Sequence, residues 1–454
     1  MELQGKKVLI IGLAKTGESL ARFLSRRGAL VKISDRKNEE ELGSKVSTWR
    51  SLGVEVEAGE HRLESFLEAD LIIPSPGVPL IPGLREAGLR GIPILSEVEL
   101  AGHFLKGRIV GVTGTNGKST TSTLIHKILK EAGFKSHLAG NIGTPLISFA
   151  EGSREDHIYV TEISSFQLEF VRDFRADVSV FLNVSINHLD WHPSFEDYLK
   201  AKTKLVLGQK RGDAAVLNRD DSLVWSLSRQ IGAAIYGFSR KREVTRGCFI
   251  RDGRIILRDA HDRPLIKVSD ISLPGAHNWD NIMAAGLVGH IFGVPAPSMR
   301  GSIKTFHGLE HRLEKVLTIK GVAFVNDSKA TTVDATIKAL QSFEAKIVLI
   351  LGGRDKGADF RKLRRWIRER AKDVVLIGEA ADKIARAIKG ARPLHRAASM
   401  KEAVRTGYSL AAGGEVVLLA PACTSFDWFR NFEDRGRVFK KEVRALAAKI
   451  SGSR

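Results

Sequence analysis

A glycine-rich segment at residues 114–120 contains the residue types that bind nucleotide phosphates. It reads Gly-Thr-Asn-Gly-Lys-Ser-Thr and lies between an apolar run that ends at Val112 and a helical pattern that extends to about Lys130. Glycines let backbone N–H groups close around phosphate oxygens, and the beginning of a helix adds partial positive charge. A lysine in this place reaches the β- and γ-phosphates, and the hydroxyl after it holds Mg²⁺. The segment therefore predicts a phosphate loop with Lys118 at the phosphates. An ordinary glycine turn is the disfavoured alternative, although the spacing from Gly111 to Gly117 is one residue wider than in the common pattern.

Two further residues have the chemistry to complete such a site. Glu162 ends the strand pattern that begins at Ile158, and His188 follows another strand pattern at residues 178–182. Side chains at strand ends of an α/β sheet point into the crevice above the sheet, and Mg²⁺ prefers oxygen ligands. Glu162 is thus a natural metal ligand, and His188 is an unusual one. Considered separately, neither residue indicates a ligand site. A lone glutamate is more often a surface charge, and a lone histidine is more often a hydrogen-bonded core residue.

A second glycine turn lies near the N-terminus. Residues 7–11 form a strand pattern that ends at Gly12, residues 17–27 have helical periodicity, and residues 29–35 form a second strand pattern that ends at Asp35. A strand, a glycine turn, a helix and a strand that ends in an acid make a βαβ unit. The turn does not match G-x-G-x-x-G. These residues leave two interpretations open, a site for a nucleotide or its diphosphate and a tight turn without a ligand.

The alternation of strand and helix patterns continues along the chain and predicts an α/β protein. Further strands are expected at residues 70–73 and 93–95, and the last third repeats the alternation from Val322 to a C-terminal helix. Residues 244–273 differ, because short alternating patterns flank a hairpin turn at residues 251–254. Three domains follow, in keeping with the length of 454 residues. We predict a Rossmann-like domain at 1–104, a central domain at 105–305 with a parallel sheet like that of P-loop ATPases and a small β-hairpin region, and a second Rossmann-like domain at 306–454.

Composition excludes several classes of protein. No apolar stretch approaches the roughly 18 residues of a membrane span, and two cysteines provide no disulfide framework. We therefore expect a soluble, cytoplasmic monomer without membrane insertion. The net charge of +19 invites a nucleic-acid partner. Its densest run, residues 361–370, nevertheless has the spacing of an amphipathic helix with a solvated basic face, so no nucleic-acid partner is expected.

Several motifs together resemble the Mur ligase family, the ATP-dependent amide-forming enzymes of peptidoglycan assembly. The resemblance covers essentially the whole chain, in order. The matching segments are 114–120, 140–143, 162–168, 187–190, 277–281 and 311–314. Two C-terminal segments, Asn-Asp-Ser-Lys-Ala-Thr at 326–331 and Pro-Ala-Cys-Thr-Ser-Phe-Asp-Trp-Phe at 421–429, resemble the members that add D-glutamate. The resemblance implies ATP and Mg²⁺ as cofactors and UDP-N-acetylmuramoyl-L-alanine and D-glutamate as substrates.

The resemblance also implies a role for individual residues. Lys118, Glu162, His188 and Lys202 would be catalytic, and Lys202 matches the lysine that the family carbamylates. The metal would be held by Ser119, Glu162, His188 and carbamylated Lys202. ATP would be bound by Gly114, Thr115, Asn116, Gly117, Lys118, Ser119, Thr120, Asn278, Asn281, Arg312 and Asp327. The UDP-linked substrate would be bound by Ala14, Lys15, Thr16, Asp35, Arg36, Ser75, Gly77 and Asn141. D-Glutamate would be bound by Lys329, Thr331, Lys356, Ser425 and Phe432.

Three residues depart from the family pattern. Thr332 replaces a common asparagine, Trp191 stands where arginine is frequent, and Phe426 replaces a smaller aliphatic residue. The alternatives are therefore a sibling Mur ligase or a ligase like folylpolyglutamate synthetase. A basic P-loop NTPase that acts on nucleic acid is the alternative from another class, and a purely structural nucleotide-binding module is disfavoured by the strand-end acid and histidine.

Overall fold

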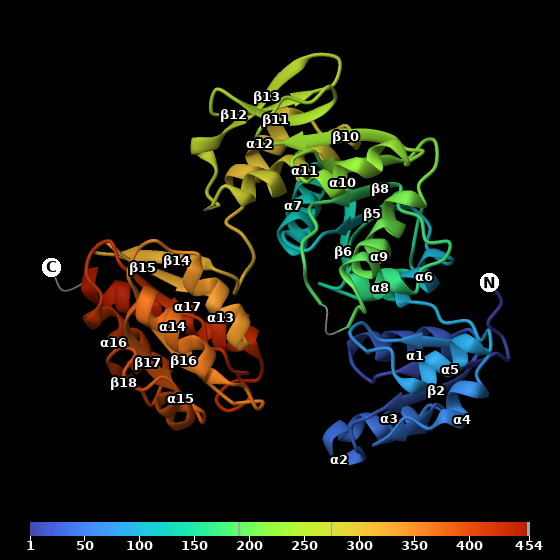
Figure 1. Ribbon diagram of the computed structural model, residues 1–454, viewed down its shortest axis with the longest axis horizontal. Coiled ribbons are helices and arrows are strands. Elements are labelled where there is room, and N and C mark those ends of the chain that lie inside the picture. Colours follow the sequence, from blue (N-terminus) through green and yellow to red (C-terminus); the bar gives the residue numbers. More distant parts are fainter. Residues whose placement is uncertain (189–190, 274, 452–454) are drawn as a thin grey trace. The chain divides into compact units, whose positions relative to one another are not determined.

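The computed structural model describes residues 1–188, 191–273 and 275–451. The chain divides into two compact units, Met1–Phe306 and His307–Arg454. The first unit contains a four-stranded and a nine-stranded sheet, and the second contains a six-stranded sheet (Figure 1). The prediction of three α/β domains is confirmed, whereas the domain boundaries stay predictions.

The N-terminal sheet is entirely parallel, with the strand order β3-β2-β1-β4. Its strands are β1 (Lys7–Ile11), β2 (Leu30–Asp35), β3 (Glu55–Ala58) and β4 (Leu71–Pro74). Its helices are α1 (Lys15–Arg26), α2 (Glu39–Leu42), α3 (Ser44–Ser51), α4 (Leu63–Leu67) and α5 (Pro82–Leu89). The strand expected at residues 93–95 is reduced to one bridge between Ile72 and Ile94, because Pro93 lacks the N–H that a longer ladder needs.

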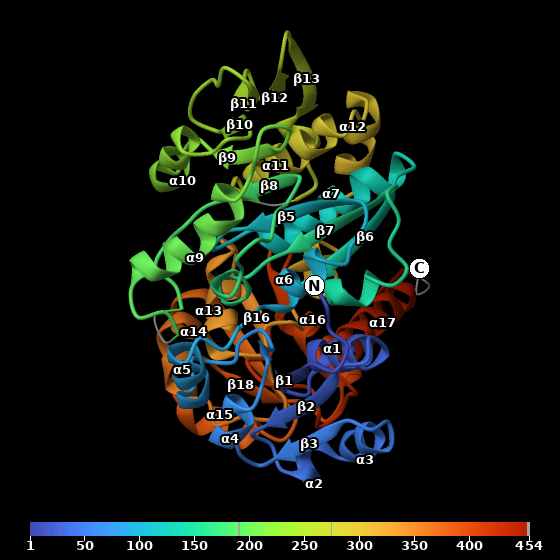
Figure 2. The same cartoon turned by 90° about the vertical axis from the view of Figure 1, so that its right-hand side faces the viewer.

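The central sheet has the order β13-β12-β11-β10-β9-β8-β5-β7-β6, which Figure 2 shows with β11, β12 and β13 at the end away from β6. Its strands are β5 (Arg108–Thr113), β6 (Lys135–Gly140), β7 (His157–Glu162), β8 (Val178–Phe181), β9 (Ala214–Asn218), β10 (Ala234–Ser239), β11 (Gly247–Arg251), β12 (Arg254–Arg258) and β13 (Asp262–Lys267). Its helices are α7 (Lys118–Glu131), α8 (Ser165–Glu169), α9 (Phe195–Leu207), α10 (Ser222–Ser226), α11 (His277–Ile291) and α12 (Ala296–Lys304). The predicted hairpin is confirmed, since β11 and β12 are antiparallel around Asp252 and Gly253, both at positive φ.

Alternate residues of the central strands pack against different helices. Val180 and Val216 join the cluster formed with α7, α11 and α12, whereas Phe181 and Leu217 join the cluster formed with α9 and α10. Successive side chains of a strand point to opposite faces, so the sheet is covered on both sides. This layering leaves the carboxyl ends of β5, β7 and β8 open for loops that bind a ligand.

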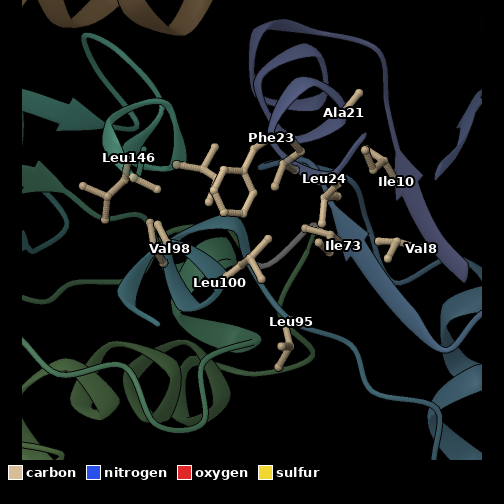
Figure 3. Packing of buried hydrophobic residues seen from close by; sticks show 14 of the residues in the cluster. Val8, Ile10, Ala21, Phe23, Leu24, Ile73, Leu95, Val98, Leu100 and Leu146 are labelled. Atoms are coloured by element: carbon tan, nitrogen blue, oxygen red, sulfur yellow. The ribbon is translucent and has the colours of Figure 1, made fainter. Parts of the chain in front are cut away.

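The N-terminal and central domains share one hydrophobic cluster. Figure 3 shows Phe23 and Leu24 of α1 grouped with Leu100 of α6 (Glu97–Gly102) and with Leu146, which belongs to the central domain. Helix α6 is also bonded to the central domain by two buried carboxylates. Glu97 accepts from the Ile147 N–H (2.7 Å), and burial raises its pKa to about 7. Glu99 accepts from the N–H groups of residues 172, 173 and 174 at 2.9–3.1 Å.

The second unit is a six-stranded sheet of order β14-β15-β19-β16-β17-β18, parallel except for the β14–β15 pair. Its strands are β14 (Glu314–Ile319), β15 (Val322–Asn326), β16 (Ile347–Gly352), β17 (Ala371–Ile377), β18 (Leu394–Arg396) and β19 (Val416–Leu419). Its helices are α13 (Val333–Gln341), α14 (Leu363–Arg370), α15 (Ala381–Ala387), α16 (Met400–Leu410) and α17 (Phe432–Ser451). Helix α14 buries Leu363 and Ile367 and exposes its arginines, as the amphipathic pattern predicts.

Each unit contains one buried free cysteine. Cys248 lies in β11 of the central sheet, and Cys423 follows β19 in the second unit. Burial raises the pKa of both thiols, that of Cys423 to about 12. In the part of the chain that the structure describes, no helix is long and apolar enough to cross a membrane.

Replacing Glu99 with alanine should lower the melting temperature by roughly 4–16 °C. The substitution leaves three backbone N–H groups without their acceptor, a loss of about 2–4 kcal/mol, and a domain of this size shifts by about 2–4 °C per kcal/mol. Differential scanning calorimetry measures the shift. The control is Glu86→Ala on α5, whose side chain is 38% exposed and paired only with Arg90. Equal melting temperatures for the two variants would contradict the role of Glu99.

Candidate active site

The phosphate loop connects the end of β5 to the beginning of α7. Gly114 and Gly117 have φ values of 153° and 85°, which favour glycine. A Cβ at Gly117 would lie 2.2 Å from Asn281 Oδ1, so a side chain is excluded there by space as well. No side chain caps the first turn of α7. Its N–H groups therefore face the loop and are available to an anion.

The loop is held in place by the segment that follows β8. Thr115 N donates to the Asn183 carbonyl (2.9 Å), and Asn116 N donates to the Asn183 side chain (2.9 Å). Thr115 Oγ1 lies 2.9 Å from Tyr198 Oη and accepts from the Ser185 N–H (3.0 Å). These bonds fix the loop before any nucleotide binds.

Lys118 lies over its own loop. Its Nζ donates to the carbonyls of Gly114 (2.9 Å) and Thr115 (3.1 Å). Both of these acceptors are neutral carbonyl oxygens of the loop that the sequence predicts to bind phosphate. Asn278 and Asn281 lie beside this part of the loop, because Asn281 accepts from Thr121 Oγ1 (3.2 Å) and donates to Asn278 Oδ1 (2.9 Å).

Glu162 provides a buried carboxylate at the same edge of the sheet. It ends β7, which pairs with β5 on one side and β6 on the other, and its residue is only 2% exposed. Its Oε1 accepts from Asn141 Nδ2 (2.8 Å), whereas the buried Oε2 has no hydrogen-bond partner in the described residues. An unsatisfied buried carboxylate oxygen is costly, and a hard cation would satisfy it. Glu162 therefore fits the predicted role of a metal ligand.

Lys202 of α9 lies under the phosphate loop. Its residue is 1% exposed, and Nζ donates to the Gly114 carbonyl (3.0 Å) and to Thr113 Oγ1 (3.3 Å). Burial lowers the pKa of Lys202 well below its ordinary value, and the charge of Lys118 lowers it further, whereas Glu162 opposes the shift. A neutral amine is a nucleophile toward CO₂, and the resulting carbamate has the oxygens that Mg²⁺ prefers.

His188 is exposed in the loop after β8, with a φ of 54°. Its ring lies 4.9 Å from that of Phe166 and 6.2 Å from that of Tyr198. Tyr198 in turn lies under the Lys202 ammonium, 4.9 Å from its ring centre. The structure thus brings His188 to the same end of the sheet as Lys202, through shared aromatic contacts. Residues 189 and 190 of the matching family segment lie outside the described residues.

Within the described residues, no group of three or more histidine, cysteine, aspartate and glutamate side chains is arranged to hold a metal ion. The donors expected here are of mixed type, namely one carboxylate, one hydroxyl, one imidazole and one carbamate. Only Glu162 and His188 among these expected ligands are histidine, cysteine, aspartate or glutamate. A site built from them with Ser119 and Lys202 would therefore not form a group of three such side chains.

The N-terminal glycine turn is braced by Asp35. Its Oδ2 accepts from the Leu13 N–H (2.7 Å), and its Oδ1 accepts from the Lys37 N–H (3.0 Å). Ser75 Oγ donates to the Gly12 carbonyl (3.1 Å). This bond connects the segment after β4, which contains Ser75 and Gly77 of the predicted substrate site, to the same turn. The turn therefore joins the carboxyl ends of β1, β2 and β4. The members of that predicted site in these segments are Ala14, Lys15, Thr16, Asp35, Arg36, Ser75 and Gly77.

In the second unit, most of the predicted residues lie on loops at the carboxyl ends of β15, β16 and β19, whereas Arg312 precedes β14 and Phe432 begins α17. Asp327 follows β15 and accepts from the Leu313 N–H (3.2 Å), and burial raises its pKa to about 6. Ser328 Oγ donates to the Phe432 carbonyl (2.8 Å), so the loop after β15 contacts the beginning of α17. Loop residues predicted for the amino acid are Lys329, Thr331, Lys356 and Ser425.

Arg435 connects these loops and was not predicted. Its residue is 1% exposed, and its guanidinium makes five hydrogen bonds, to Ser328 Oγ and O and to the carbonyls of Cys423 and Thr424. Burial lowers its pKa to about 10, and no carboxylate forms an ion pair with it in the described residues. A single arginine in a charged helical pattern gives no sequence signal of burial. Arg435 is therefore a positioning residue for the two loops.

Comparison with known proteins assigns the family. Three family models match the chain, described as Mur ligase MurD-like, N-terminal domain at residues 6–96, Mur ligase middle domain at 112–289, and Mur ligase, glutamate ligase domain at 311–423. The UDP-N-acetylmuramoylalanine–D-glutamate ligase of Acidobacterium capsulatum is 46% identical over 449 residues, which are 98% of this chain and 97% of that protein. The enzyme of the same name from Koribacter versatilis is 44% identical over 449 residues, 98% of this chain and 99% of that protein. The chain belongs to the Mur ligase family.

Solved structures show the same fold. The UDP-N-acetylmuramate–alanine ligase of Thermotoga maritima has a TM-score of 0.54 at 17% identity, covering 97% of this chain and 100% of that chain. The pseudomurein peptide ligase type C of Methanothermus fervidus has a TM-score of 0.53 at 18% identity with the same coverage, 97% and 100%.

Replacing Lys118 with alanine should lower the rate of ATP-dependent turnover by on the order of 10³-fold while the protein stays folded. The variant loses a charged contact that strengthens as phosphate charge develops in the transition state. Steady-state release of ADP measures the rate, and circular dichroism measures the fold. Lys130→Ala, at an exposed position on the same helix, is the control. Near-native turnover in folded Lys118→Ala would exclude the phosphate-loop assignment.

Proposed function

We propose that this chain is an ATP-dependent ligase that joins D-glutamate to UDP-N-acetylmuramoyl-L-alanine in peptidoglycan synthesis. The main support is that relatives with this activity align along 98% of the chain at 46% and 44% identity. Further support comes from the phosphate loop, the buried Glu162 carboxylate and the buried Lys202 amine, whose pKa burial lowers. The proposal includes a cytoplasmic monomer.

The reaction proceeds in two displacements. A substrate carboxylate oxygen attacks the γ-phosphorus of ATP, the bond from phosphorus to the bridging oxygen breaks, and an acyl phosphate and ADP form. The D-glutamate amine then attacks the acyl carbon, an amide forms, and inorganic phosphate leaves. Lys118 and the N–H groups at the beginning of α7 bind the phosphates through both steps. The exclusion of water during the first step protects the acyl phosphate from hydrolysis.

Mg²⁺ would be held by Ser119, Glu162, His188 and carbamylated Lys202. When bound, it compensates the negative charge of the phosphates. Asn141 has a part in this arrangement, because its amide N–H fixes Glu162 Oε1 and leaves Oε2 open. The proposed contact of Asn141 with the muramoyl substrate would use the remaining polar atoms of its side chain.

The remaining assignments rest on family resemblance. Asn278 and Asn281 would meet the adenine, and Arg312 and Asp327 would contact the nucleotide. The glycine turn with Asp35, Arg36, Ser75 and Gly77 would seat the UDP group. D-Glutamate would be bound by Lys329, Thr331, Lys356, Ser425 and Phe432. Of these residues, Lys329, Thr331 and Ser425 lie on the two loops that Arg435 positions.

D-Glutamate should be the only efficient amino-acid acceptor. Two carboxylates held at once fix the amine, so an inverted centre misplaces it, and a misplacement of about 1 Å costs about 10²-fold in rate. The measurement is ADP release with UDP-N-acetylmuramoyl-L-alanine and each candidate amino acid. Equal kcat/KM for D- and L-glutamate, or a preference for a diamino acid or for L-alanine, would indicate a sibling ligase. Stimulation of ATP hydrolysis by DNA or RNA would indicate the alternative class.

Replacing Lys202 with alanine should nearly abolish activity, and a short carboxylic acid in the buffer should restore part of it. The acid would occupy the place of the lost carbamate oxygens at the metal. Lys200→Ala, at an exposed position on the same helix, should keep normal activity. Full activity of Lys202→Ala without added acid would show that Lys202 is not a metal ligand. Mass spectrometry of the native protein in bicarbonate should also detect a carbamate on this lysine.

A further inference from the structure

Three side chains form a hydrogen-bonded chain at the carboxyl ends of β2 and β3. Ser34 Oγ lies 2.9 Å from Glu57 Oε1 and 2.8 Å from His61 Nδ1. Ser34 is fully buried, and His61 is half-buried. The site assignments above give none of these three residues a role.

The hydrogen bonds determine which nitrogen of His61 has the proton. Glu57 also accepts from Ser65 Oγ (2.6 Å) and from the Arg62 N–H (2.9 Å). Burial raises the pKa of Glu57, but these hydrogen bonds outweigh it and hold the pKa below its ordinary value. The carboxylate only accepts, so the Ser34 hydroxyl donates to it and its oxygen accepts from His61 Nδ1–H. The Ser34 hydroxyl proton could also be donated to the Glu60 carbonyl, but that contact is longer, at 3.4 Å, and therefore weaker.

This arrangement leaves His61 Nε2 as a fixed acceptor. Burial lowers the pKa of His61 and Arg36 lowers it further, while Asp35 and Glu57 oppose the shift, so the net shift favours the neutral ring. Neutral imidazole with its proton on Nδ1 has a lone pair on Nε2. In the described residues, Nε2 has no hydrogen-bond partner, and the Phe66 ring packs edge-on against the imidazole. The ring is thus oriented by protein contacts on one side, with an open polar atom on the other.

His61 lies next to the proposed UDP site. Ala58 pairs with Asp35 in the sheet, and the Gly59 N–H donates to the carbonyls of Asp35 (3.0 Å) and Lys37 (2.8 Å). The loop that leads to His61 is therefore bonded to the segment after β2, at the edge where α/β sheets bind ligands, and His61 interacts electrostatically with Asp35 and Arg36 there. Each Asp35 oxygen already accepts a backbone N–H, whereas His61 Nε2 is open.

We propose that His61 is a binding residue for the uridine end of the UDP-linked substrate, with Nε2 accepting a hydrogen bond from the uracil imide N–H or a ribose hydroxyl. The proposal rests on the proposed function, which supplies the UDP group. Both donors are neutral and directional, which suits an oriented neutral acceptor better than a charged side chain.

Calorimetric titration of the full chain tests the proposal, with UDP-N-acetylmuramoyl-L-alanine and, separately, ATP as ligands. His61→Leu should weaken binding of the UDP-linked substrate about tenfold, the effect of one hydrogen bond, and leave ATP binding unchanged. His61→Gln keeps an acceptor near the position of Nε2 and should bind within about threefold of wild type. Glu64→Gln, at an exposed position on α4, is the control.

Each result has a defined meaning. Unchanged binding by His61→Leu, or equal weakening by His61→Leu and His61→Gln, would overturn the proposal. If the wild-type chain does not bind the UDP-linked substrate, the proposed function fails instead. N3-methyl-UDP lacks the uracil imide N–H, and 2′-deoxy-UDP lacks one ribose hydroxyl. The analogue that wild type and His61→Leu bind equally tightly is the one that lacks the group donating to His61.

Discussion

The charged side chains around the phosphate loop, buried Lys202 and Glu162 beside half-buried Lys118, are the constraint on which the central domain depends. Lys118, Lys202 and Glu162 interact electrostatically there, and two ammonium groups beside one carboxylate leave an excess of positive charge. Lys118 is only half-buried, and its Nζ donates to two carbonyls of the loop. Burial of Lys202, together with the charge of Lys118, lowers the pKa of Lys202 and so favours its neutral form. The same burial that makes the Lys202 ammonium costly favours the neutral amine, the form from which the proposed carbamate would be made.

The second unit also contains a buried basic side chain, that of Arg435. Arg435 is as buried as Lys202, but a guanidinium does not readily lose its proton. Its charge is instead dispersed over five hydrogen bonds to carbonyl and hydroxyl oxygens of two loops. Because every acceptor is neutral, the positive potential of the arginine persists near the loops proposed for an acidic amino acid. Positioning and electrostatic attraction therefore come from one side chain.

The sequence predicted those features whose residue types have few alternatives. Gly117 is recognisable in the sequence because only glycine fits a left-handed turn against a packed side chain, and Lys118 follows it directly. The Asp252-Gly253 pair is recognisable because it specifies a tight hairpin. Strand β6 was not predicted, since its residues Lys135–Gly140 include polar side chains that the neighbouring strands tolerate. Arg435 and His61 gave no signal, because their burial and bonds depend on loops distant in sequence. The sequence assigned Asp35 to a ligand but gave no sign that its oxygens also accept from two backbone N–H groups.

The placement of the cysteines has a practical consequence. Each unit contains one thiol, buried and with a raised pKa, so neither is a reactive thiolate in the folded chain. An alkylating reagent can label Cys248 only when the central sheet opens, and Cys423 only when the second unit opens. The two labelling rates, separated by peptide mapping, would report the local opening of each half of the protein independently, without any engineered probe.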